Sequence, residues 1–155
     1  MVDGPGFRTS IYCAGCRHQC PGCHNPQSWA FDQGREMSVD EIMKIIVADP
    51  YANVTFSGGD PMYQAGAFTE LAREIHRQTN KDIWCYTGFT FEQLITNPRQ
   101  RALLEQIDVL VDGPFLREQR DETLLFRGSR NQRIIDVQAS LEARQTITLT
   151  YTSVL

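Results

Sequence analysis

The sequence predicts an α/β fold, a shortened and partial barrel of parallel strands with helices outside it. Short apolar strands alternate with amphipathic helices along most of the chain, which is the pattern of βα units. The strands look buried, as strands of parallel sheets usually are. The 155 residues fall short of the roughly 200 or more that a complete eight-stranded barrel needs. We therefore expect an incomplete barrel with a lateral opening.

The bulk composition is that of one globular domain, which we expect to span residues 1–155. Hydrophobic residues make up 41% of the chain and charged residues 22%, as in ordinary folded domains. The net charge of −4 argues against direct binding of nucleic acid, which favours basic proteins. Because neither an 18-residue apolar run nor a signal peptide is present, we expect a cytoplasmic protein with no membrane segment.

The first elements have clear boundaries in the sequence. Residues Phe7 to Cys13 alternate with a period of two, which predicts a strand. Ser38 followed by Glu41 is a capping box, and apolar residues then recur at helical spacing as far as Asp49. A strand and its helix are therefore expected on either side of a cysteine-rich loop.

The later elements repeat this alternation. The expected strands are Asn53 to Ser57, Asp82 to Thr87, Ile107 to Val111 and Arg133 to Val137. The expected helices are Ala67 to Gln78, Phe91 to Ile95 and Arg99 to Gln106, the last two being separated by Asn97-Pro98. The stretch 140–155 has little pattern, so we expect a loosely attached tail.

Four of the five cysteines lie between positions 13 and 23. This spacing is too tight for a disulfide framework and is typical of metal ligation in a reducing compartment. Cys16, Cys20 and Cys23 place three thiolates on one loop, a spacing suited to a single iron-sulfur cube. Three ligands leave one iron open, and an open coordination site distinguishes catalytic metal centres from closed structural ones.

Cys13 supports a rival interpretation, in which four cysteines close an electron-transfer cluster or a zinc site. Zinc ribbons, however, usually separate their two cysteine pairs by about 15 to 20 residues. Cys13 also shares the inward face of the first strand with Phe7 and Ile11, which favours a small buried hydrophobe. Cys85 lies between two aromatic residues in a predicted strand and is expected in the core.

A glycine turn follows the second predicted strand, about 35 residues after the cysteine loop. In Ser57-Gly58-Gly59-Asp60-Pro61, the two glycines allow a ligand to approach the backbone closely, and Asp60 can pair with an ammonium group. The same residues also fit an ordinary turn. His24, directly after Cys23, is compatible with a turn or with a place beside a bound cofactor.

Together the cysteine motif and the glycine turn resemble the paired motifs of radical S-adenosylmethionine (SAM) enzymes. The resemblance implies a radical SAM fold, a 4Fe-4S cluster on the three cysteines of the motif, and SAM on its open iron. Gly22 stands where many members carry an aromatic residue near adenine, so adenine contacts are expected from elsewhere. The cofactor-binding residues implied are Gly22, His24, Ser57, Gly58, Gly59 and Asp60.

The resemblance narrows to the activases of glycyl radical enzymes through Asp3 to Arg8 and through Cys23-His24-Asn25-Pro26. The short length, with residues 111–115 and 126–133, is most similar to the activases of anaerobic ribonucleoside-triphosphate reductases. This implies reductive cleavage of SAM to methionine and a 5'-deoxyadenosyl radical, with an electron from a flavodoxin or similar donor. The implied partner is the large glycyl radical subunit.

Three alternatives remain at this point. One is a pyruvate formate-lyase-type activase or another small radical SAM enzyme, such as a deazapurine-forming one. The second, of another class, is a non-catalytic iron-sulfur electron carrier, and the third is a zinc-binding interaction module. The arginines of residues 117–133 fit either a solvated loop or a surface that docks a partner or binds carboxylates.

Overall fold

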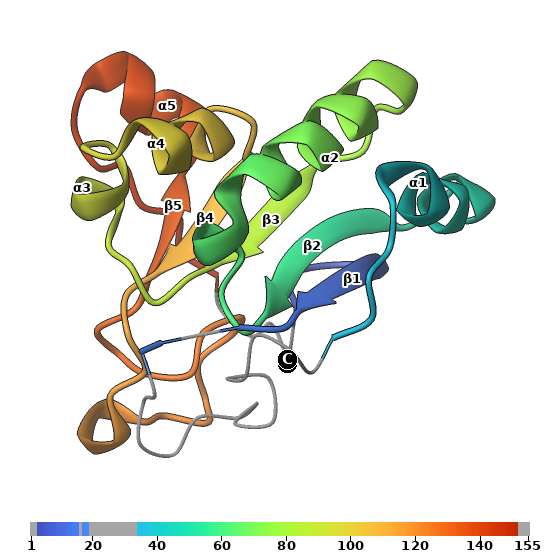
Figure 1. Cartoon of the computed structure of the whole chain (residues 1–155). Helices are drawn as coiled ribbons and strands as arrows, with labels where there is room; N and C mark the ends of the chain where they lie inside the picture. The colour runs from blue at the N-terminus through green and yellow to red at the C-terminus, as the bar shows by residue number, and fades with distance from the viewer. Residues whose placement is uncertain (1–2, 16, 19–33, 152–155) are drawn as a thin grey trace.

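A five-stranded sheet forms the centre of the protein in the computed structural model, which describes residues 3–15, 17–18 and 34–151. The strands lie side by side in chain order, and the first four are parallel (Figure 1). They are β1 (Arg8–Cys13), β2 (Asn53–Gly58), β3 (Ile83–Tyr86), β4 (Val109–Asp112) and β5 (Arg133–Asp136). The chain is therefore of the mixed α/β class.

Helices follow the strands, most of them where the sequence predicts them. They are α1 (Val39–Ala48), α2 (Ala65–Gln78), α3 (Phe91–Leu94), α4 (Pro98–Leu104) and α5 (Val137–Ala143), with 3-10 turns η2 (Pro61–Gln64) and η3 (Arg117–Gln119). The predicted capping box is confirmed, because the Glu41 amide donates to Ser38 Oγ at 3.1 Å and the Ser38 amide donates to Glu41 Oε1 at 3.3 Å. Helix α5 was not predicted.

One face of the sheet carries the main core. Alternate strand residues such as Phe56, Cys85 and Leu110 point to this face and are fully buried against the helices, as the two-residue period of a strand requires. All five α-helices contribute to this core and lie along the same side of the sheet (Figure 1). Among the described residues, no helix has the length and hydropathy needed to cross a membrane.

The last strand corrects the prediction of parallel strands throughout, because β5 runs antiparallel to β4. A parallel pair needs a crossover connection that returns the chain to the other end of the sheet. The connection between β4 and β5 holds only the 3-10 turn Arg117–Gln119, so the chain re-enters the sheet from the end it has just left. The described sheet is thus parallel with one antiparallel edge.

The stretch expected as a loose tail begins inside α5, which runs to Ala143. Beyond that helix, the Leu149 amide donates to the Ile134 carbonyl at 2.7 Å, and the Asp136 amide donates to the Ile147 carbonyl at 2.9 Å. Tyr151 packs against the rings of Trp84 and Phe126. Residues 147–149 thereby pair with β5, and 152–155 lie outside the described residues.

The first strand agrees with its predicted face except at Phe7. Cys13 is buried and Ile11 packs against the core, whereas Phe7 is 80% exposed. Strand β1 begins only at Arg8, after Gly6 in a left-handed conformation at φ 73°. The alternation therefore does not extend to Phe7, and the expectation that it faces inward is wrong.

Candidate functional site

The predicted motifs gather at one edge of the sheet. Because β1 to β4 are parallel, their carboxyl ends lie together. The cysteine loop leaves the end of β1 and the glycine turn leaves the end of β2. Of the predicted site residues, Ser57, Gly58, Gly59 and Asp60 are described, while Cys16, Cys20, Gly22, Cys23 and His24 lie outside the described residues.

The beginning of the cysteine loop lies directly on the glycine turn. The Gly59 amide donates to the Cys13 carbonyl at 2.7 Å, and the Asp60 amide donates to the Gly15 carbonyl at 2.8 Å. The Gln64 side chain donates to the Ala14 carbonyl. Three consecutive carbonyls immediately before Cys16 are thus held by the turn and by η2. The structure brings together two segments that are separated by about 45 residues in the sequence.

The two glycines are required by this close approach. Gly58 adopts φ 97°, a conformation that L side chains rarely take, and a Cβ on it would lie 2.5 Å from the Cys13 amide nitrogen. At Gly59 a Cβ would overlap the Gly15 peptide, lying 2.7 Å from its carbonyl carbon. Part of the space that we expected a ligand to use is therefore filled by the chain itself.

Ser57 and Cys13 complete the contact between the strand ends. The Cys13 thiol donates to the Ser57 carbonyl at 3.3 Å, and both residues are buried. Cys85 lies in the core as predicted, and burial raises the pKa of its thiol well above the ordinary value. A thiolate is the form that binds metals, so burial makes Cys85 a poor ligand.

Asp60 is fully buried and its carboxylate is enclosed by donors. Oδ1 accepts the Met62 amide at 2.9 Å, which caps η2. Oδ2 accepts the Thr87 hydroxyl and the Gly88 amide, both at 2.9 Å, and lies 2.8 Å from His18 Nε2. The sequence suggested that this carboxylate would face an ammonium group of a ligand. In the structure its donors are groups of the protein, drawn from the cysteine loop and from the segment after β3.

His18 is a site residue that the sequence analysis missed. It lies between Cys16 and Cys20, and its ring packs against Tyr63 of η2 and against Phe89 after β3, with ring centroids 5.4 and 4.7 Å apart. The available clue was a histidine placed between two cysteines that are predicted to bind a metal. Its partners come from distant segments that no local pattern connects.

The carboxyl end of β4 is held by an ion cluster. Asp112 is buried and accepts the Phe91 amide at 2.8 Å and Arg133 Nε at 3.0 Å. The same guanidinium makes two hydrogen bonds to Glu92, at 2.7 and 2.9 Å, and lowers the pKa of that carboxyl to about 2. Arg133 therefore ties α3 to β4 and β5 instead of lying in a solvated loop.

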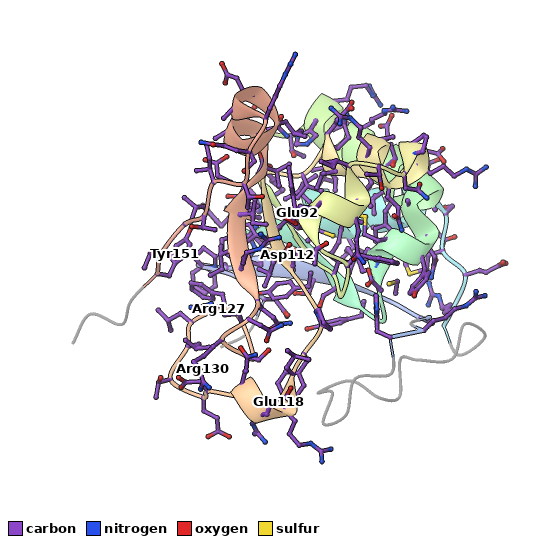
Figure 2. The ribbon with its side chains drawn as sticks, turned by 90° about the vertical axis from the view of Figure 1, so that its left-hand side faces the viewer. Glu92, Asp112, Glu118, Arg127, Arg130 and Tyr151 are labelled. Atoms are coloured by element: carbon purple, nitrogen blue, oxygen red, sulfur yellow. The ribbon has the colours of Figure 1, made fainter. Side chains whose placement is uncertain are left out.

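The other arginines of this region lie beyond the sheet. Figure 2 shows Arg127 and Arg130 in the loop before β5, well below Glu92 and Asp112. Arg127 donates within this loop, to the Arg130 and Gln132 carbonyls at 3.1 and 2.6 Å, and Arg130 is exposed. Arg120 pairs with Glu122 at 2.7 Å, with both groups exposed. Arg127 therefore helps to order the loop, whereas Arg120 and Arg130 are exposed to solvent. None of these contacts shows a docking role.

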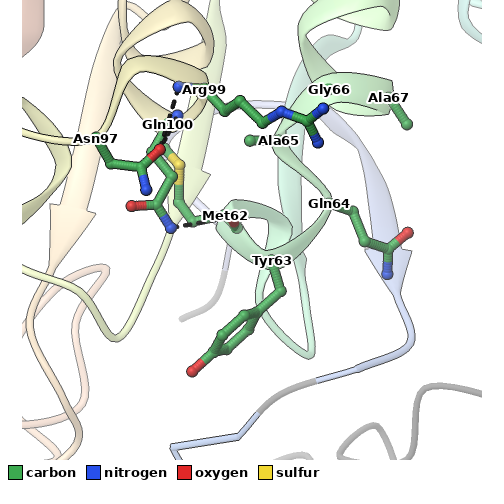
Figure 3. A pocket seen from close by; sticks show the side chains of 9 residues that line it. All are labelled: Met62, Tyr63, Gln64, Ala65, Gly66, Ala67, Asn97, Arg99 and Gln100. Carbon is green, nitrogen blue, oxygen red and sulfur yellow. Dashed lines mark hydrogen bonds between the residues drawn. The ribbon is translucent and has the colours of Figure 1, made fainter.

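A cavity of about 370 Å³ lies beside η2 (Figure 3). Its lining residues come from η2, the start of α2 and the start of α4, and none of the predicted site residues is among them. In Figure 3 the Tyr63 ring points away from Arg99 and Gly66. Tyr63 and Gln64 line the cavity and also contact His18 and the Ala14 carbonyl, so the cavity borders the candidate site at η2.

Comparisons with known proteins agree on one relationship. A family model described as "4Fe-4S single cluster domain" matches residues 2–135. The anaerobic ribonucleoside-triphosphate reductase-activating protein of Vibrio cholerae is 41% identical over 141 residues, which cover 85% of this chain and 89% of that protein. The proteins of the same name from Haemophilus influenzae and Escherichia coli K12 are 37% and 34% identical, over 85% of this chain and 89% and 90% of theirs.

Proposed function

Because the chain belongs to the family of anaerobic ribonucleoside-triphosphate reductase-activating proteins, with a 4Fe-4S single cluster domain, we propose that it generates a glycyl radical on such a reductase. The overall reaction consumes one electron and one SAM and yields methionine, 5'-deoxyadenosine and the glycyl radical. The observation that carries the proposal is the docking of the cysteine loop onto the glycine turn. This contact supports a common site for the two motifs.

The donor set fits a cluster with one open iron. Cys16, Cys20 and Cys23 would hold the cluster, because thiolates are the usual ligands of iron-sulfur clusters and three of them leave one iron for another ligand. When bound, the cluster supplies the electron that cleaves the carbon-sulfur bond of SAM. Cys13 is buried against the Ser57 carbonyl, which supports a structural role for it and disfavours a fourth thiolate ligand.

The residues around the turn would bind and orient SAM. Ser57, Gly58 and Gly59 lie at the carboxyl end of β2, next to the strand that leads into the cysteine motif. Asp60 would act indirectly, because its enclosed carboxylate fixes the backbone of the turn. Gly22 and His24 belong to the same proposed site. The backbone of the turn, rather than the Asp60 side chain, would thus contact the amino group of SAM.

A shortened radical SAM barrel is part of this proposal. Four parallel strands with helices on one face are compatible with part of a barrel wall. A wall that does not close leaves a side through which a loop of the large reductase subunit can reach the cluster. A small-molecule enzyme would instead be expected to close its site against water. A flavodoxin or similar reduced protein would donate the electron.

The test uses the anaerobically reconstituted full chain with SAM, a reductant and the candidate reductase from the same organism. We expect 5'-deoxyadenosine in the reaction mixture and a glycyl radical in the electron paramagnetic resonance spectrum. Omission of SAM should abolish both. The proposal would be contradicted if the chain forms no 5'-deoxyadenosine and binds either zinc or an iron-sulfur cluster held by four cysteine thiolates. That result would favour an electron carrier or a zinc module.

A further inference from the structure

We propose that His18 is a positioning residue that anchors the cluster-binding loop to the carboxyl ends of β2 and β3. The inference rests on the proposed function in one respect, namely that Cys16 and Cys20 bind the cluster. His18 lies midway between them in the sequence. A side chain fixed at this point restricts where both thiolates can lie, so its anchoring controls how well the loop is preorganised for the cluster.

The first support is the hydrogen bond to Asp60. His18 Nε2 lies 2.8 Å from Asp60 Oδ2, and the Asp60 side chain is 1% exposed. A hydrogen bond to a buried carboxylate is among the stronger ones in proteins. Three other donors, from Met62, Thr87 and Gly88, hold the same carboxylate in place. The acceptor for His18 is therefore fixed independently of the loop.

The second support is the fit of the imidazole ring. The rings of Tyr63 and Phe89 lie 5.2 Å apart, and the His18 ring packs edge-on against Phe89 and tilted against Tyr63, which gives a cluster of three aromatic rings. The neighbouring Arg17 places its guanidinium 6.0 Å from the Tyr63 ring centre. Two consecutive residues of the loop thus contact the same tyrosine.

The third support is Gly88, which makes room for the ring. A Cβ at this position would lie 2.6 Å from His18 Cδ2, well inside the distance of normal carbon-carbon contact. Any side chain here would displace the imidazole. The socket for His18 is therefore formed by four residues from two segments. They are Asp60, Tyr63, Gly88 and Phe89.

The anchor complements the backbone contacts of residues 13–15. Those contacts fix the chain just before Cys16, and His18 fixes it just after. Cys16 is therefore flanked on both sides by residues docked to the Gly58-Gly59-Asp60 turn and η2. The described residues on both sides of the first cysteine are therefore held by the same part of the fold.

The test measures iron loss from the reconstituted full chain to the ferrous chelator bathophenanthroline disulfonate under anaerobic conditions. His18→Ala is expected to lose iron about 10- to 100-fold faster than wild type, as is usual when groups that orient metal ligands are removed. His18→Gln should recover part of the loss, since its amide can donate to Asp60. His18→Phe retains a ring but no donor and should lose iron faster than His18→Gln.

The matched control is His76→Ala. His76 is an exposed histidine of α2 that contacts the Gln106 carbonyl at 2.7 Å, and its variant should lose iron at the wild-type rate. The thermal midpoint of each apoprotein separates anchoring from general unfolding, and we expect His18→Gln and His18→Phe to stay close to wild type. The inference is overturned if His18→Ala and His18→Phe lose iron at the same rate as wild type. It is also overturned if His76→Ala loses iron as fast as His18→Ala. Neither result depends on SAM, whereas the proposed function fails if wild type forms no 5'-deoxyadenosine.

Discussion

Replacing Gly59 with alanine tests whether the glycine turn is shaped by the cysteine loop. The Gly59 position needs no unusual φ, so the whole effect of the added methyl group is steric. Its Cβ would lie 2.7 Å from the Gly15 carbonyl carbon and 2.8 Å from the Gly15 nitrogen. Both neighbours are backbone atoms, which cannot move aside as the end of a side chain can. The loop and the turn must therefore separate.

The magnitude follows from that separation. Ordinary contact with a Cβ begins near 3.4 Å, and the Gly15 carbonyl oxygen would lie closer still than the carbon at 2.7 Å. The two backbones must therefore move apart by more than about 0.7 Å, and such overpacking costs about 1 to 3 kcal/mol. The movement also weakens the hydrogen bonds that the Gly59 and Asp60 amides donate to the Cys13 and Gly15 carbonyls, each worth about 1 kcal/mol. We expect the free energy of unfolding to fall by about 2 to 4 kcal/mol, or roughly 5 to 15 °C in Tm.

The assay is urea unfolding of the apoprotein, followed by iron content after anaerobic reconstitution. Gly66→Ala is the matched control, because a Cβ at Gly66 meets nothing within 4 Å and Gly66 lies in α2. That variant should gain about 0.5 to 1 kcal/mol from the better helix propensity of alanine. Equal stability of Gly59→Ala and Gly66→Ala, with normal iron content in both, would refute the close approach of loop and turn.

Three further predictions concern the proposed cluster ligands, the buried Asp60 carboxylate and the Glu92–Arg133 ion pair. Alanine variants of each of the three motif cysteines should lose iron and SAM cleavage, whereas Cys13→Ala should keep both; iron loss with Cys13→Ala would indicate a fourth ligand. Asp60→Ala leaves four donors without their acceptor and should cost about 3 kcal/mol in urea unfolding; a change under about 1 kcal/mol would be inconsistent with the enclosed carboxylate. The pKa of Glu92 falls from 4.5 to about 2 beside Arg133, so its ion pair stabilises the fold above about pH 4.5 and loses that effect as the pH falls toward 2. Because Glu92 is 55% exposed, the contribution should stay under about 1 kcal/mol, and the Tm advantage of wild type over Glu92→Gln should shrink in that range; an advantage that is constant with pH would contradict it.

Local patterns in the sequence were sufficient for most of the fold. The capping box of α1 involves residues 38 and 41 only, and each parallel strand shows its own alternating or apolar pattern. The pattern of β5 itself did not reveal its direction, because an apolar strand has the same composition in either direction. The direction depends on whether a crossover helix connects β4 to β5, and the described residues between these strands form none. Helix α5 was missed because it starts directly after β5, with Asp136 ending the strand and capping the helix.

The site was predictable as motifs but not as contacts. Gly58 and Gly59 were recognisable as a turn, yet the reason no side chain fits there is the approach of the segment 13–15. His18 gave no local pattern, since its partners are set by the folding of β2 and β3 beside β1. Asp60 was predicted to face a ligand, and its burial reflects the same convergence of strand ends.

The wide sequence separation within the His18 socket bears on how the protein is made. Phe89 leaves the ribosome about 70 residues after His18, which at roughly 5 to 20 residues per second takes about 4 to 14 s. During that interval the nascent chain carries its cysteine motif without the residues that receive it. Under the proposed function, insertion of the cluster therefore follows translation of this region, and the motif thiols stay reduced until then.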